Sequence, residues 1–90
     1  MARNIRFMFD WGHQWPLWES GSDKYAMEPS DYGLSAELAE RLRAVYDAWL
    51  EHWDRGWDSP EALAAWTSDR RQALAILRRE VADFADVEDV

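Results

Sequence analysis

Bulky apolar side chains occupy every second position near the start of the chain, between residues 4 and 11. A period of two is typical of a β-strand that buries one face, and aromatic residues favour strands. Gly12 ends the pattern, and Pro16 interrupts the next segment, which we interpret as a turn followed by an extended return. The segment 4–20 is therefore predicted to form a strand or a hairpin. The side chains expected on its buried face are those of Ile5, Phe7, Phe9 and Trp11.

The spacing of apolar residues changes to three and four between residues 38 and 53, which predicts a helix. Ser35 is a suitable N-cap, and Glu37 lies in the first turn, where the helix dipole favours a carboxylate. Gly56 is a suitable stop. We therefore expect a helix over residues 36–55. Its apolar stripe consists of Leu38, Leu42, Val45, Trp49 and Trp53.

A second helix is predicted because Ser59 provides an N-cap, Pro60 suits the first helical position and Glu61 follows as an acid. Apolar positions continue at helical spacing to Phe84, so the helix is expected over residues 60–84. The linker between the two helices is short, so they should pack as an antiparallel hairpin. The apolar stripe consists of Leu63, Trp66, Leu74, Leu77, Val81 and Phe84.

The rest of the chain shows no strong periodicity. Residues 21–34 are expected to form a loop, and residues 85–90 an acidic tail in which Val87 and Val90 could add a short strand. Together these elements predict a single domain of the α+β class over residues 1–90. In this fold, an N-terminal strand or hairpin packs on an antiparallel two-helix hairpin, and a short C-terminal strand is an optional addition.

Seven of the 90 residues are tryptophan, and most of them fall in two groups. Three lie within residues 11–18, and three follow at every fourth position over residues 49–57. Tryptophan combines a large apolar surface with an N–H donor, so it dominates either a core or an interface. We expect most of these rings in the core and one or two exposed, with Trp15 and Trp18 the best candidates for exposure. The candidate binding cluster is Trp11, Trp15, Trp18 and Tyr25.

The formal net charge is −8, and cysteine is absent. An acidic surface repels nucleic acid and anionic membranes, and it favours a basic protein partner. No run of the sequence reaches the ~18 apolar residues that cross a bilayer, and the N-terminal segment lacks the pattern of a signal peptide. We therefore expect a cytoplasmic protein that binds neither nucleic acid nor membrane.

Candidate chemical groups are few. Asp10 and His13 lie where the expected strand ends, and a carboxylate three residues from an imidazole could serve acid–base chemistry or half of a metal site. The interpretation we favour is that Asp10 caps the turn through a backbone hydrogen bond and that His13 is solvated. The chain has no serine in a nucleophile-elbow pattern and no glycine-rich phosphate loop. The sequence therefore predicts no catalytic residue, no metal and no cofactor.

Arg70 is a further candidate, because it falls near the centre of the apolar stripe of the second helix, between Trp66 and Leu77. An arginine there must extend to solvent, pair with a carboxylate, stack on an aromatic ring or face a ligand. Pairing or stacking inside the fold is favoured, because buried charges are usually paired. An anion-binding site beside the aromatic cluster is the alternative.

The chain contains three short motifs: Phe-Met-Phe-Asp-Trp-Gly over residues 7–12, Trp-Pro-Leu-Trp over residues 15–18 and Tyr-Gly-Leu-Ser over residues 32–35. With these motifs the chain resembles a group of short, acidic, tryptophan-rich proteins of high-GC bacteria. Some members of that group are similar to small immunity proteins, which neutralise a toxin by binding it. The resemblance covers most of the chain, and it assigns no functional residue.

We predict that the chain is not an enzyme but a small acidic protein-binding module of the immunity or antitoxin kind, which acts by occlusion. An acidic rim would steer a basic partner, and exposed tryptophans would anchor it. One alternative is a small enzyme or ligand-binding module that uses Asp10, His13 and Arg70 at the aromatic cluster. Another is an inhibitor that mimics DNA. A homodimer is expected if residues 13–20 leave an edge of the N-terminal strand unpaired.

Overall fold

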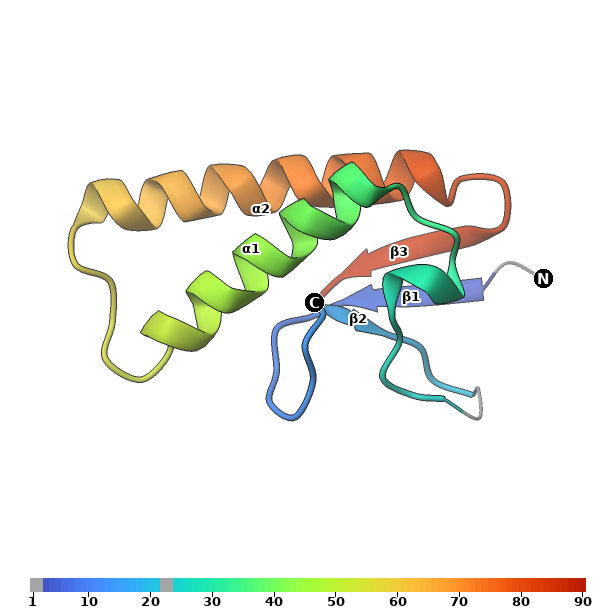
Figure 1. Cartoon of the computed structure of the whole chain (residues 1–90), viewed down its shortest axis with the longest axis horizontal. Helices are drawn as coiled ribbons and strands as arrows, with labels where there is room; N and C mark the ends of the chain where they lie inside the picture. The colour runs from blue at the N-terminus through green and yellow to red at the C-terminus, as the bar shows by residue number, and fades with distance from the viewer. Residues whose placement is uncertain (1–2, 22–23) are drawn as a thin grey trace.

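The computed structural model describes residues 3–21 and 24–90, so residues 22–23 of the expected loop lie outside the described part. A three-stranded sheet is covered on one face by two helices (Figure 1). This arrangement confirms the α+β class, with strands near the N-terminus, a helical pair and a C-terminal strand. The strands are β1 (Arg3–Phe7), β2 (Leu17–Trp18) and β3 (Ala85–Asp89), the helices are α1 (Ala36–His52) and α2 (Pro60–Glu80), and a short 3₁₀ helix, η1 (Pro29–Asp31), precedes α1.

β1 is the central strand of the sheet. It pairs with β2 in the antiparallel sense, with Arg6 opposite Trp18, and with β3 in the parallel sense, with Ile5 opposite Val87. Ile5 and Phe7 lie on the helix-covered face and are fully buried, which is the burial that their alternation predicts. β2 pairs with β1 at Arg6 and Phe7, and the homodimer expected from an unpaired edge stays a prediction.

The β1 strand is shorter than the alternating pattern. It ends at Phe7, although the sequence suggested a strand as far as Trp11. Phe9 still packs against the core, but Trp11 lies in the following loop and 54% of its surface is exposed, so its predicted burial is wrong. Gly12 has φ +80°, a left-handed conformation that favours glycine, and the chain turns there.

α1 begins where its cap predicts and is tied to α2. The N–H of Leu38 donates to Ser35 Oγ at 3.2 Å. In turn, the N–H and hydroxyl of Ser35 donate to the carboxylate of Glu80, at the end of α2, at 2.8 and 2.6 Å. α1 ends at His52, before the expected end at residue 55.

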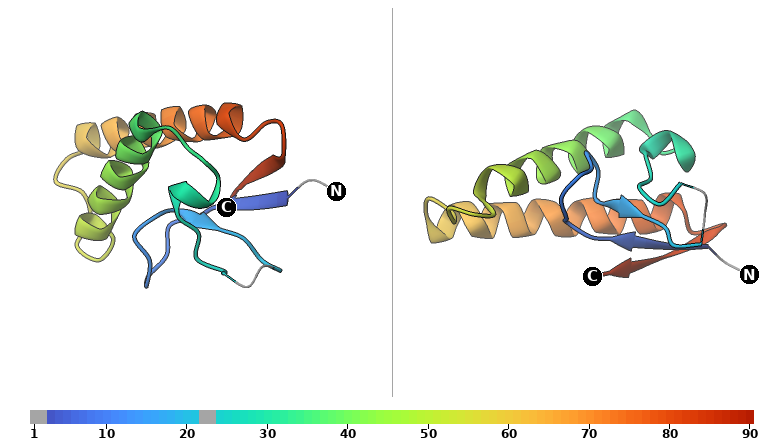
Figure 2. Two further views of the ribbon diagram at one scale, coloured as in Figure 1. Left: turned by 45° about the vertical axis from the view of Figure 1, so that its right-hand side comes forward. Right: turned by 90° about the horizontal axis from the view of Figure 1, so that it is seen from below.

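α2 begins at Pro60, and the N–H of Ala62 donates to Ser59 Oγ at 3.0 Å. It ends at Glu80, before the expected end at residue 84, because the chain turns into β3 there. Most of the segment 85–90, expected to form an acidic tail, is therefore a strand. The two helices run in opposite senses and are inclined to each other (Figure 2). No helix in the described part of the chain is long and apolar enough to span a membrane.

The core lies between the sheet and the halves of the helices that cover it. At the linker end, α1 and α2 extend beyond the strands (Figure 1). Leu63, at the linker end of the second predicted stripe, is consequently 42% exposed. Phe84, at the other end of that stripe, lies in the turn after α2 and is 37% exposed. The core side chains are those of Ile5, Phe7, Leu17, Met27, Tyr32, Leu38, Leu42, Ala73, Leu74, Leu77, Val81 and Ala85.

Candidate binding surface

Trp18, expected to be exposed, is buried. Its indole N–H donates to the carbonyl of Met8 at 2.9 Å, and only 6% of the residue is accessible. The rings of His13 and Tyr25 contact it, with centroids 4.9 and 5.2 Å away. Trp18 therefore stabilises the fold, and its predicted exposure is wrong.

Tyr25 is the exposed member of that group, with 47% of its surface accessible. The guanidinium of Arg6 lies over its ring, 5.1 Å from the centroid, and donates to its hydroxyl. Trp15 is half-buried and packs against the core, with the guanidinium of Arg43 6.0 Å from its ring centroid. Neither Trp15 nor Trp18 thus presents a free indole face comparable to that of Trp11.

Asp10 and His13 lie in the loop between β1 and β2, and each binds the backbone. Asp10 Oδ1 accepts a hydrogen bond from the N–H of Trp11 at 2.8 Å, as expected of a capping residue. His13 Nε2 lies 2.6 Å from the carbonyl oxygen of Met27, and because a carbonyl only accepts, this nitrogen carries a proton. His13 is half-buried rather than solvated. Within residues 3–21 and 24–90, no three His, Asp or Glu side chains gather as a metal ion would require.

The residues of the ligand-binding alternative are not brought together. A hollow of about 490 Å³ opens beside His13, and Asp10 and Arg70 do not line it. Its lining residues are Gly12, His13, Gln14, Trp15, Ala26 and Glu28. Acid–base chemistry would need the three groups around one reacting atom, and this geometry does not supply that.

Arg70 is paired and stacked inside the fold, as favoured above. Its guanidinium forms an ion pair with the carboxylate of Asp89 on β3. It also lies over the rings of Phe7 and Phe9, 5.0 and 5.6 Å from their centroids. The hydrogen bond from Arg70 lowers the pKa of Asp89 below its usual value. Arg70 therefore fastens β3 to α2.

A second ion pair, whose carboxylate is buried, lies at the other end of the sheet. Arg3 donates to Glu19 from Nε at 3.1 Å and from Nη2 at 2.9 Å, and the Tyr32 hydroxyl donates to the same carboxylate at 2.8 Å. Burial, together with that hydrogen bond, raises the pKa of Tyr32 well above its ordinary value. This network fixes the loop after β2 against η1, so its role is structural.

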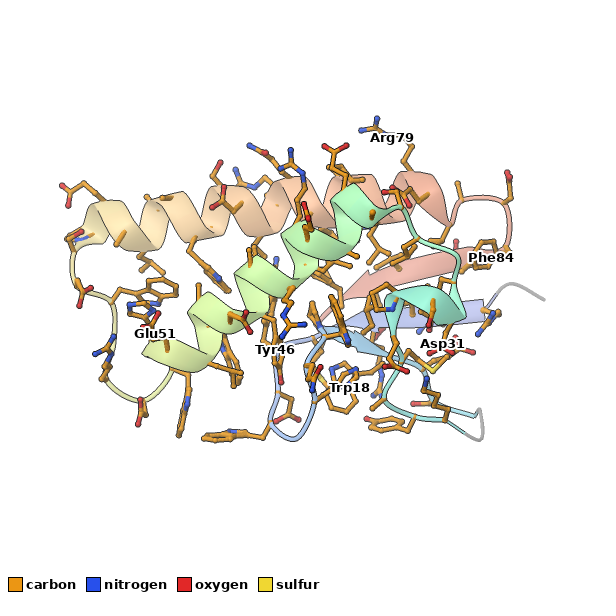
Figure 3. All side chains as sticks on the ribbon, viewed as in Figure 1. Trp18, Asp31, Tyr46, Glu51, Arg79 and Phe84 are labelled. Atoms are coloured by element: carbon orange, nitrogen blue, oxygen red, sulfur yellow. The ribbon has the colours of Figure 1, made fainter. Side chains whose placement is uncertain are left out.

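Two exposed indole rings meet at the linker end of α1. Trp53 is 44% exposed, and its ring contacts that of Trp11 edge to face, with centroids 4.1 Å apart. Leu50, 37% exposed, lies three residues before Trp53, which caps the C-terminal end of α1. Tyr46 lies between α1 and the β1–β2 loop (Figure 3), and its hydroxyl donates to the carbonyl of Asp10, which holds the loop in place. We call Trp11, Leu50 and Trp53 the aromatic patch.

Carboxylates surround the aromatic patch. Asp47 lies three residues before Leu50, on the same side of α1, and Asp54 follows Trp53 in the turn after the helix. Asp10 precedes Trp11 in the loop, and all three acids are exposed. Arg43, 3.8 Å from Asp47, neutralises part of this charge. The patch therefore lies inside a net acidic rim.

Trp53 was missed as a site residue because it continues the apolar stripe of α1. Its position just after the last helical residue, three residues before Gly56, is the signal that could have found it. A side chain at the end of a helix that extends beyond the sheet has no core to enter.

An exposed pair of indole rings inside a charged rim is typical of a protein-binding domain. The chain belongs to the Serratia CdiI immunity protein-like family, which it matches over residues 3–88. It is thus an immunity-type inhibitor that binds another protein, and such families are generally non-enzymatic. Its resemblance to immunity proteins is confirmed. No curated protein and no solved structure matches the chain.

Proposed function

We propose that the protein neutralises a toxin by occlusion, with the aromatic patch as the anchor and the acidic residues around it as the steering charge. The observation that carries this proposal is the contact between Trp11 and Trp53, each with more than 40% of its surface exposed. Large aromatic residues that a fold leaves in water are the residues that most often dominate binding energy in an interface. The partner is a basic protein, because the chain carries a net charge of −8.

The aromatic patch should govern how long the complex lasts. We expect Trp11→Ala and Trp53→Ala each to weaken binding of the toxin by about 2 kcal/mol, or roughly thirtyfold, mainly through the dissociation rate. Their effects should not add, because the two rings touch each other. The toxin is identified by pull-down from the native host, and the rates are measured by surface plasmon resonance.

Ionic strength should affect the association rate and the dissociation rate differently. The association rate should fall steeply as ionic strength rises, because exposed charges are screened within ~8–10 Å near physiological salt. The dissociation rate should respond much less, because it depends on buried contacts. Neutralising Asp47 and Asp54 together should lower the association rate and leave the dissociation rate nearly unchanged.

Phe84→Ala is the matched control, because Phe84 is a similarly exposed ring at the other end of the molecule (Figure 3). It should leave both rates unchanged. A toxin that binds equally well to the wild type, Trp11→Ala and Trp53→Ala proteins, at a rate that ignores salt, would contradict the proposal. Circular dichroism of each variant verifies that the fold is intact.

A further inference from the structure

A hollow of about 410 Å³ lies between α1 and α2, on the far side of α1 from the aromatic patch. The indole rings of Trp57 and Trp66 line it, and so does Val45. Its volume falls within the ~300–1,000 Å³ of pockets that hold small ligands. The hollow exists because the facing positions of both helices carry alanine, whose small side chain does not fill the space between the inclined helices. These positions are Ala44, Ala48, Ala62 and Ala65.

The aromatic lining of the hollow is held in place. The indole N–H of Trp66 donates to the carbonyl of Val45 at 2.9 Å, which joins α2 to α1. The ring of Trp57 lies 5.2 Å from that of Trp66, and it stacks on His52 with centroids 4.3 Å apart and planes inclined by 6°. The His52 ring is itself bonded to the carbonyl of Ala48 at 2.8 Å. These contacts pre-form the pocket before any partner arrives.

The rim of the hollow is acidic. Asp69 lines the hollow itself. Three more exposed acids lie three or four residues from lining alanines, a spacing that places them on the same face of the helix. They are Glu40, Glu51 and Glu61. Glu51 lies at the linker end of α1 (Figure 3).

The neighbouring bases do not cancel this charge. Arg41 also lines the hollow, but it pairs with Glu37 at 3.5 Å and donates to Gln72 at 3.4 Å. Arg55 donates to the carbonyl of Glu51 at 2.9 Å, at the edge of the linker. With Glu37 included, the hollow is surrounded by more carboxylates than guanidinium groups, so its potential favours a cation.

We propose that this hollow receives an arginine side chain of the partner protein. The aliphatic stem would contact the alanines and indole rings, and the guanidinium would reach the acidic rim. Arginine suits both features, because its planar cation stacks on aromatic faces and pairs with carboxylates. Three exposed acids of α1, Glu40, Asp47 and Glu51, lie between the hollow and the aromatic patch, so one partner could contact both. The inference rests on the proposed function only for the identity of the partner.

The first test needs no toxin. The protein labelled with ¹⁵N is titrated with Nα-acetyl-arginine methylamide, and the indole N–H signals of Trp57 and Trp66 are followed by NMR. The citrulline analogue, neutral and nearly the same shape, is the control. We expect saturable shifts with the arginine compound, and binding weaker by roughly threefold or more with citrulline, the size of one exposed charge pair. Equal binding of both compounds, or shifts confined to Trp11 and Trp53, would overturn the inference.

Two variants test whether the arginine compound binds in the hollow. Ala48→Leu adds bulk to the half-buried wall and should abolish the shifts without unfolding the protein. Asp69→Asn should weaken binding by roughly threefold and remove part of its salt dependence. Asp83→Asn, a matched loss of charge in the turn between α2 and β3, should change nothing. If Ala48→Leu binds the arginine compound as well as the wild type does, the compound lies elsewhere and the inference fails.

Measurements with the toxin separate this inference from the proposed function. Ala48→Leu should weaken toxin binding while Trp11 and Trp53 are intact. If Ala48→Leu has no effect but Trp11→Ala does, the hollow is not used and the proposed function stands. If neither Ala48→Leu nor Trp11→Ala weakens toxin binding, both the inference and the proposed function fail.

Discussion

Replacing Leu77 by alanine tests how firmly α2 is fixed to the sheet. Leu77 is fully buried in the core between the helices and the strands. The change removes three carbon atoms, worth ~0.8 kcal/mol each or about 2.4 kcal/mol together, and the cavity left behind adds to that loss. We therefore expect the free energy of unfolding to fall by about 2.5–5 kcal/mol.

Leu63→Ala provides the matched control on the same helix. Leu63 is 42% exposed beyond the edge of the sheet, so its loss should cost less than about 1 kcal/mol. Urea unfolding followed by circular dichroism distinguishes the two. With an m-value of roughly 1 kcal/mol/M, the midpoint should fall by about 2.5 M or more for Leu77→Ala and by less than about 1 M for Leu63→Ala. Similar midpoints for both variants would refute this account of the core.

Two further predictions concern groups at the sheet. Because Arg70 holds the pKa of Asp89 below its unfolded value, about 3.9, the pair stabilises the fold above that pH, and the contribution is lost as pH falls through the folded pKa. Asp89→Asn should lower the free energy of unfolding by up to about 1 kcal/mol near neutral pH, a small effect because the carboxylate is 43% exposed. A variant whose thermal midpoint equals that of the wild type at every pH would contradict this. Trp18→Phe should cost about 1–2 kcal/mol, because the carbonyl of Met8 loses its donor, and unchanged urea unfolding would argue that the bond contributes nothing.

The helix starts could be predicted because their signals are local. Ser35 and Ser59 each accept a hydrogen bond from the backbone N–H three residues later, and both serines can be recognised as caps in the sequence. The C-terminal strand was less evident, because a segment with three acids has a poor strand propensity of its own. It forms because β1 offers a free edge and Arg70 neutralises Asp89, and both partners are distant in the chain.

The exposure of the tryptophans could not be predicted from spacing. Trp18 and Trp53 look alike in the sequence, each at the end of an apolar pattern. Trp18 is covered because Tyr25 and His13 pack against it. Trp53 follows the last residue of α1, and that end of the helix extends past the sheet (Figure 1). Periodicity identifies the face that a side chain takes, but burial also depends on whether another element reaches that point.

The overhang of the helices explains how stability and binding can be separated in so small a protein. Residues that fix the fold, such as Leu77 and the pair of Arg70 with Asp89, lie where both helices cover the strands. The aromatic patch lies on the part of α1 that extends past them, together with the loop that Tyr46 holds against it. A substitution there removes few core contacts, so it should lower the free energy of unfolding only slightly, even where it alters binding to a toxin. For this reason we expect Trp53→Ala to lower the free energy of unfolding by less than about 1 kcal/mol while it weakens toxin binding by roughly thirtyfold. Comparable losses in unfolding and in binding would show that the two functions share the same contacts.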